Sequence, residues 1–309
     1  MSNRLPGPLR PAAASRRNFL LGAAATTVLA ACSGSGGDSE AGPSGAELDP
    51  NDLSILRFFG PYFAAEQTAR IPFGLSDSAG LLPADAVPGN LVVSVKNPDG
   101  DVVAEDLTAV LHADGLPRPY YAFEFTPAST GFYDFTTDVD GAEVISQFSV
   151  IAADAPEIAP RVDPGDEMPA LVTPTVADGL GVTPICTRDP ICPLHDQTVA
   201  DVVGNAPMAL LVATPAFCQT VICGPVLDVM LGIMDDYPDV SFVHAEVFTN
   251  PEENSVPLSI EDFAPVVTDL GLPYEPAFYA VGGDGVVRDR LDYIFDADDM
   301  RASLDQVIA

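Results

Sequence analysis

The chain has 309 residues, 47% of them hydrophobic, which is enough for two domains with separate cores. Its 45 acidic and 13 basic residues give a formal net charge of −32. A surface of this charge repels nucleic acids and anionic lipid headgroups, so neither is expected as a partner.

The first 31 residues have the pattern of an export signal. Arg16 and Arg17 precede an apolar run that ends at Ala31 and is shorter than the ~20 residues of a membrane-spanning helix. The stretch SRRNFL resembles a twin-arginine translocation signal, and the later LAAC resembles a bacterial lipobox. The resemblance implies that Cys32 is acylated, which would make the protein a lipoprotein anchored to the cell membrane outside the cytoplasm.

Removal of residues 1–31 would take away four arginines and no acidic residue. The remaining 9 basic and 45 acidic residues would give a net charge of 9 − 45 = −36. Residues 32–52 are small and polar, which predicts a flexible tether. Export would also place the other four cysteines where disulfides form and persist.

Short apolar runs that alternate with polar residues extend over 53–152, separated by turn signals. Examples are LVVSV, YYAFEF, FYDFTT and VISQFSVI. About seven short strands in ~100 residues are typical of an immunoglobulin-like sandwich, and the residues around Tyr133 resemble the tyrosine corner of such sandwiches. We therefore expect an all-β sandwich that serves as a spacer or docking module. The following 153–183 are rich in proline and predict an extended linker.

In the last part of the chain, 184–309, predicted strands alternate with predicted helices, as is typical of an α/β domain. The continuous apolar runs MALLVAT and VSFVHAEVF are typical of strands buried on both faces. We expect strands at 208–214 and 240–248, helices over 223–237 and 260–272, two strands joined by the GGDG turn, and a last helix that begins near 296.

This order of elements, β-α-β-α-β-β-α, resembles the thioredoxin fold. Cys218 and Cys223 lie at the first junction of strand and helix, and Pro276 lies where that family has a cis-proline opposite its thiols. The resemblance covers roughly 164–309. It implies that Cys218 is the nucleophile of a redox-active pair, that Cys223 resolves the mixed disulfide, and that Pro276 shapes the docking groove.

The two cysteines are spaced C-x-x-x-x-C, whereas thioredoxins have C-x-x-C. Five residues of continuous helix would turn the two side chains about 140° apart. A bond between Cys218 and Cys223 therefore requires that Cys218 precede the helix or that the first turn unwind. We expect Cys218 at the helix N-terminus, where unpaired backbone N–H groups lower a thiol pKa.

The same spacing resembles the C-x-x-x-x-C-G arrangement of peroxiredoxin Q-type peroxidases, which Cys218, Cys223 and Gly224 match. Leu211 and Pro215 stand where those enzymes have Pro and Thr. A peroxidase would need a guanidinium group, which Arg288 or Arg290 could supply.

The other two cysteines, Cys186 and Cys192, flank a short loop, and a local structural disulfide is expected between them. Four thiols allow three connectivities, and a relay from Cys218 and Cys223 to this pair stays open. A third alternative is a metal site in which Cys186, Cys192 and His195 are ligands, and His244 or the pair of Cys218 and Cys223 completes the set. Copper-handling members of the thioredoxin superfamily use two cysteines and a distant histidine. We assign no metal or other cofactor and expect His244 to be a buried, hydrogen-bonded histidine.

The sequence thus predicts a membrane-anchored, extracytoplasmic thiol–disulfide oxidoreductase whose partners are disulfide-bearing or dithiol proteins. The alternatives are a non-catalytic thioredoxin-like scaffold, a thiol peroxidase and a copper metallochaperone. The signatures of P-loop, Rossmann, zinc-protease and nucleophile-elbow enzymes are not found in the sequence.

Overall fold

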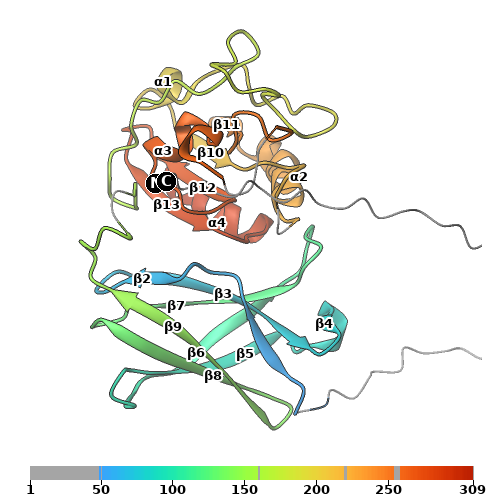
Figure 1. Ribbon diagram of the computed structural model, residues 1–309, viewed down its shortest axis with the longest axis vertical. Helices are drawn as coiled ribbons and strands as arrows, with labels where there is room; N and C mark the ends of the chain where they lie inside the picture. Colours follow the sequence, from blue (N-terminus) through green and yellow to red (C-terminus); the bar gives the residue numbers. More distant parts are fainter. Residues whose placement is uncertain (1–48, 50, 159–160, 219–220, 254–257, 309) are drawn as a thin grey trace, which may run out of the picture. The chain divides into compact units, whose positions relative to one another are not determined.

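The computed structural model describes residues 49, 51–158, 161–218, 221–253 and 258–308 (Figure 1). The export signal with Arg16 and Arg17, the lipidation site Cys32 and most of the tether lie outside the described residues, so those assignments stay predictions. Gly45–Ala309 forms one unit, built mostly of β-strands. Within the described ranges, no helix combines the length and the apolar character that a membrane span requires.

Nine strands form the first sheet, in the order β1-β3-β7-β6-β5-β8-β9-β2 with β4 paired to β3. The strands are β1 (Ser54–Arg57), β2 (Tyr62–Ala64), β3 (Ala69–Asp77), β4 (Gly80–Leu81), β5 (Asn90–Lys96), β6 (Val102–His112), β7 (Tyr120–Phe125), β8 (Gly131–Val139) and β9 (Ala142–Ile151). Alternate residues of these strands point inward to a core rich in aromatic side chains, among them Phe73, Phe123 and Phe135. The sheet curls around this core (Figure 1).

The β-rich first part is therefore confirmed, but its strands are not divided into the two separate sheets of the predicted sandwich. β5 pairs with β6 on one side and with β8 on the other, so the hydrogen bonding runs through the whole sheet. Near the start of β8, the Tyr133 hydroxyl donates to the Ser129 carbonyl at 3.0 Å and accepts from the Ser129 N–H at 3.1 Å. This local closure is the contact expected of a tyrosine corner.

The proline-rich segment after β9 has no helix or strand among its described residues up to α1 (Val199–Val202), as its composition predicts. It is nevertheless packed rather than free. Met168, Leu171 and Val182 are buried in the core of the second sheet, and the Met168 N–H donates to the Gly285 carbonyl at 2.8 Å. The segment thus contributes to the α/β part of the fold.

The second sheet has four strands in the order β11-β10-β12-β13, with β10 parallel to β11 and antiparallel to β12. Its strands are β10 (Met208–Val212), β11 (Ser241–Ala245), β12 (Ala277–Val281) and β13 (Val287–Asp292). Its larger helices are α2 (Cys223–Ile233), α3 (Pro265–Asp269) and α4 (Ala297–Ile308). These elements follow one another in the order that the sequence predicts, although the expected helix over 260–272 is reduced to α3 and a short 3-10 turn, Ile260–Asp262.

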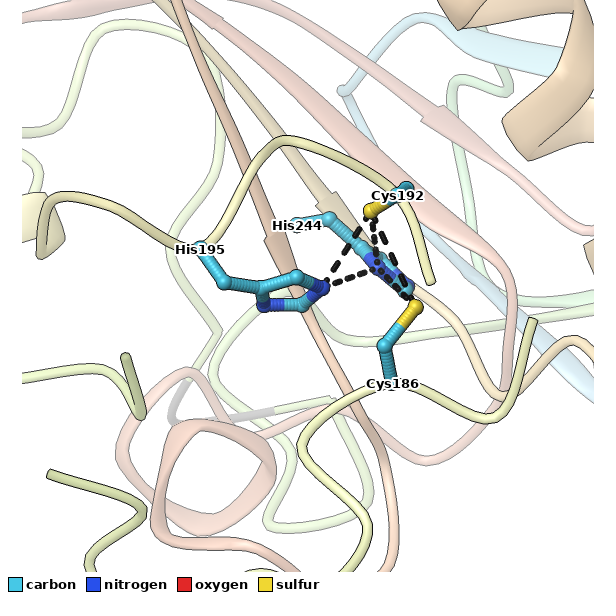
Figure 2. Close-up of side chains that lie close together, drawn as sticks. All are labelled: Cys186, Cys192, His195 and His244. Carbon is cyan, nitrogen blue, oxygen red and sulfur yellow. Dashed lines mark hydrogen bonds between the residues drawn. The ribbon is translucent and has the colours of Figure 1, made fainter. Parts of the chain in front are cut away.

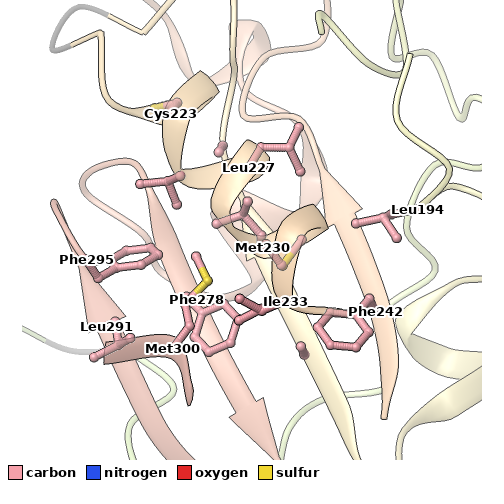
Figure 3. Packing of buried hydrophobic residues seen from close by; sticks show 14 of the residues in the cluster. Leu194, Cys223, Leu227, Met230, Ile233, Phe242, Phe278, Leu291, Phe295 and Met300 are labelled. Atoms are coloured by element: carbon pink, nitrogen blue, oxygen red, sulfur yellow. The ribbon is translucent and has the colours of Figure 1, made fainter. Parts of the chain in front are cut away.

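Both faces of this sheet are covered, which explains the continuous apolar runs of its strands. Leu211 and Phe278 point to the face that α2 and α4 cover, and Leu210 and Tyr279 point to the face that α1 and α3 cover. Figure 3 shows the side chains of α2, which begins at Cys223, packed with Phe278 and its neighbours. Because side chains alternate along a strand, each residue of β10, β11 and β12 can be assigned to one of these two faces.

Candidate functional site

The first candidate site is the disulfide between Cys218 and Cys223, whose Cα atoms are 6.0 Å apart. Cys218 lies in the loop after β10, before the helix begins. This is one of the two alternatives that allow the bond; the other is an unwound first turn. The expectation that Cys218 stands at the helix N-terminus is wrong, because Cys223 is the first residue of α2. Pro225 explains the difference, since proline is tolerated only in the first turn of a helix and α2 cannot begin much earlier.

The two cysteines differ in exposure. Cys218 retains 8% of its surface exposed, whereas Cys223 retains none. Cys218 also lines a groove of about 660 Å³ whose other walls are mostly apolar, formed by residues that include Phe217, Phe248, Phe263, Leu272 and Tyr274. Of the two cysteines, Cys218 is thus the one that faces this groove.

A buried carboxyl group, Glu275, lies next to the inaccessible sulfur. Its Oε2 is 3.4 Å from Cys223 Sγ and accepts a hydrogen bond from the Thr214 N–H at 2.7 Å. Glu275 directly precedes Pro276, joined to it by a cis peptide bond, at the start of β12. The only signal for Glu275 in the sequence was its place beside that proline, and sequence reasoning missed it.

Burial raises the pKa of Glu275 to about 7, and the charge of Glu246 adds to the rise, while the hydrogen bond from Thr214 opposes it. Near neutral pH this carboxyl group is therefore protonated in a large fraction of molecules. A protonated carboxyl group at this distance can supply a proton to a Cys223 thiolate when the disulfide opens.

We expect Glu275→Gln to remove part of the pH dependence of stability. Because the pKa of Glu275 is raised in the folded state, its contribution to stability is complete below the unfolded value and is lost as the pH rises through about 7. That loss amounts to about 3 kcal/mol. Denaturant unfolding of wild type and variant from pH 4 to pH 8 measures it, and stability curves that stay parallel would show that Glu275 does not titrate in this range.

The second candidate site is a buried cluster of two cysteines and two histidines (Figure 2). Cys186, Cys192 and His195 come from the irregular segment before α1, and His244 comes from β11. The predicted disulfide of this pair is not formed: both cysteines are free, and their sulfurs are 3.8 Å apart. Each sulfur instead faces the imidazole nitrogens, with Cys192 Sγ 3.2 Å from His195 Nε2 and 3.4 Å from His244 Nδ1.

The strand alternation of β11 decides the direction of His244. Its neighbour Val243 packs on the α1 and α3 face, so His244 points to the opposite face, where the cysteines lie. Its Nε2 is 3.0 Å from the Ala213 carbonyl oxygen, which can only accept, so Nε2 carries the hydrogen. His244 is thus buried and hydrogen-bonded as expected, and its Nδ1 lone pair faces the cluster.

The loop that carries the cysteines is held by polar contacts to β11, to the residue Glu246 just after it, and to α2. The Thr187 N–H donates to a Glu246 carboxylate oxygen at 2.5 Å, and Arg188 donates to Asp228 at 2.8 Å. The His244 N–H donates to the Leu194 carbonyl, so the loop also covers the outer edge of β11. Sequence reasoning missed Glu246, although it follows His244 by two residues, just after the end of β11.

The two thiols of the cluster are coupled through their own hydrogen bond. This hydrogen bond between the two sulfurs lowers the pKa of the Cys186 thiol and raises the pKa of the Cys192 thiol. The pair therefore releases one proton readily and keeps the other.

The two arginines considered for peroxide binding are engaged with carboxylates. Arg288 donates to Asp284 at 2.7 Å, and Arg290 donates to Asp292 at 3.0 Å and to Asp163 at 3.3 Å. The side chain of Arg290 is nearly fully buried. Both guanidinium groups thus have partners already.

Comparisons with known proteins give no family for this chain: no protein-family model matches it, and no curated protein is similar in sequence. Among solved structures, the Lin-41 filamin domain is 19% identical over 32% of this chain and 91% of its own, with a TM-score of 0.24. A titin domain is 11% identical over 33% of this chain and 95% of its own, with a TM-score of 0.20. A Salmonella alpha-2-macroglobulin mutant is 16% identical over 57% of this chain and 10% of its own, with a TM-score of 0.26. Likenesses at this level carry no conclusion about function.

Proposed function

We propose that this protein is a thiol–disulfide oxidoreductase that acts through Cys218 and Cys223 on protein partners. The observation that carries the proposal is the disulfide itself, with one sulfur on an apolar groove and the other beside a carboxyl group of raised pKa. Groups with perturbed pKa values are concentrated at functional sites. The apolar walls favour a partner segment whose reactive cysteine is flanked by apolar side chains.

The α/β part is, in this proposal, a thioredoxin-like domain. The support lies in the strand order β11-β10-β12-β13, in helices on both faces, and in the place of Pro276 directly before β12. The first sheet is proposed to be an immunoglobulin-like spacer, supported by its antiparallel strands and the Tyr133 contact. The proposal includes a location outside the cytoplasm through lipidation of Cys32, which is supported by the sequence pattern.

The reaction begins when a partner thiolate attacks Cys218 Sγ, the accessible sulfur. The bond between Cys218 and Cys223 breaks, and its electron pair leaves on Cys223 as a thiolate. The N-terminus of α2 stabilises this charge, since the first N–H groups of a helix have no partner within it. Glu275 then donates its proton to the Cys223 sulfur.

A second partner thiol, once deprotonated, attacks the partner sulfur of the mixed disulfide and releases Cys218. The partner has then lost two electrons and two protons to form a disulfide, and the protein has gained them as a dithiol. The same steps in reverse reduce a partner disulfide. The reduction potentials of the two pairs decide the direction.

A redox titration tests the proposal. The protein is equilibrated in glutathione buffers of graded potential and then alkylated, and mass spectrometry measures the fraction of oxidised Cys218 and Cys223. A redox-active pair is expected to titrate above about −300 mV. A pair that stays oxidised below that potential would be a structural disulfide, and this result would favour the non-catalytic scaffold instead.

A further inference from the structure

The four buried ligand groups of the second cluster are arranged as the corners of a tetrahedron. Around a zinc ion with ordinary bond lengths, two sulfurs lie about 3.8 Å apart, two nitrogens about 3.3 Å, and a sulfur and a nitrogen about 3.5 Å. Here the two sulfurs are 3.8 Å apart, and His195 Nε2 is 3.3 Å from His244 Nδ1. Three of the four sulfur–nitrogen distances are 3.2, 3.4 and 3.8 Å, and all four ligand atoms lie within 4.8 Å of one another.

We propose that Cys186, Cys192, His195 and His244 bind one zinc ion in a closed, four-coordinate site. This site is separate from the proposed redox pair, and its existence does not depend on that function. Two thiolates and two imidazoles in tetrahedral geometry are a ligand set that zinc prefers, and hard cations such as Mg²⁺ or Ca²⁺ do not select it.

The charges of the ligand set suit a buried ion. All four residues are buried, so an uncompensated charge there would be costly. Two cysteine thiolates cancel the two positive charges of zinc, and the imidazoles bind it as neutral groups. The fixed tautomer of His244 already directs a lone pair inward, because the Ala213 carbonyl holds its Nε2–H.

The neighbouring residues form an outer shell that positions these ligands. Glu246 holds Thr187, which follows Cys186 directly, and the Leu194 carbonyl binds the backbone of His244. Partners of this kind orient the ligands of metal sites. With four protein ligands and no place left for substrate, the zinc would be structural and would tie the irregular loop to the edge strand β11.

Metal binding and the disulfide first expected for this pair are mutually exclusive. Oxidation of Cys186 and Cys192 would consume both thiolates that bind the ion. The redox state of this pair in the native protein therefore reports on the site directly.

Metal analysis of the full chain purified without oxygen tests the proposal. We expect one zinc per chain in the wild type and at least a tenfold lower content in His244→Gln and in Cys186→Ser. His112→Gln is the matched control, because His112 is the one other histidine of the chain. Cys218→Ser is the matched cysteine control, and both controls are expected to keep the zinc.

A measurement on the wild type covers the case in which a ligand variant does not fold. Reduced protein freed of metal is titrated with Co²⁺, and we expect the intense visible bands of tetrahedral cobalt together with sulfur-to-cobalt charge transfer at one equivalent. Addition of Zn²⁺ should abolish these bands. Absence of the bands, copper in place of zinc in the purified protein, or a native disulfide between Cys186 and Cys192 would each overturn the proposal.

Discussion

Removal of zinc from the reduced protein should lower its melting temperature by about 10 °C. A ligand that binds only the folded state stabilises it by about 4 kcal/mol when its concentration is 1,000 times Kd. For a chain of this size, 1 kcal/mol corresponds to roughly 2–4 °C. The large effect follows from the position of the site, because three of its ligands lie on a segment without helix or strand that the ion would fix to β11.

Thermal unfolding followed by circular dichroism, with and without a chelator, measures this effect. Zn²⁺ added back should restore the melting temperature, and Mg²⁺ should not. His244→Gln should lose its response to the chelator, whereas Cys223→Ser should keep it, since that cysteine belongs to the other site. An equal response of wild type and His244→Gln would mean that the chelator acts elsewhere on the protein.

The second large effect is expected in disulfide exchange. Cys223→Ser should accumulate a mixed disulfide on Cys218, because serine cannot attack that bond to release the partner. Cys218→Ser should form no adduct, because the remaining sulfur of Cys223 has no exposed surface. Turnover of a disulfide-bonded peptide with apolar flanks should fall to the buffer background in both variants.

Mass spectrometry of the reduced variants after incubation with that peptide locates the adduct. The double variant Cys186→Ser with Cys223→Ser controls for the thiols of the other cluster. Its adduct on Cys218 should equal that of Cys223→Ser alone. Faster labelling of Cys223 than of Cys218 would reverse the roles that accessibility assigns to the two sulfurs.

The sequence alone was sufficient for the features that depend on short stretches of chain. Hydrophobic periodicity is local, so it predicts the order of strands and helices in the α/β part and the β-rich character of the first part. The sequence left three pairings of the four cysteines open, and the structure forms the local one between Cys218 and Cys223. The start of α2 at Cys223 agrees with the helix predicted over 223–237, and only the placement of Cys218 at its N-terminus was wrong.

Only the tertiary structure decided which distant side chains share a site. His195 and His244 are 49 residues apart, and Thr214 and Glu275 are 61 apart. Their meeting depends on the register in which β10 pairs with β11 and β12, where His244 lies beside Leu211 and Ala277 beside Val212. A shift of one residue would turn His244 to the opposite face and separate it from the cysteines, because side chains alternate along a strand. Register is set by packing across the whole sheet, so no short stretch of the chain contains it.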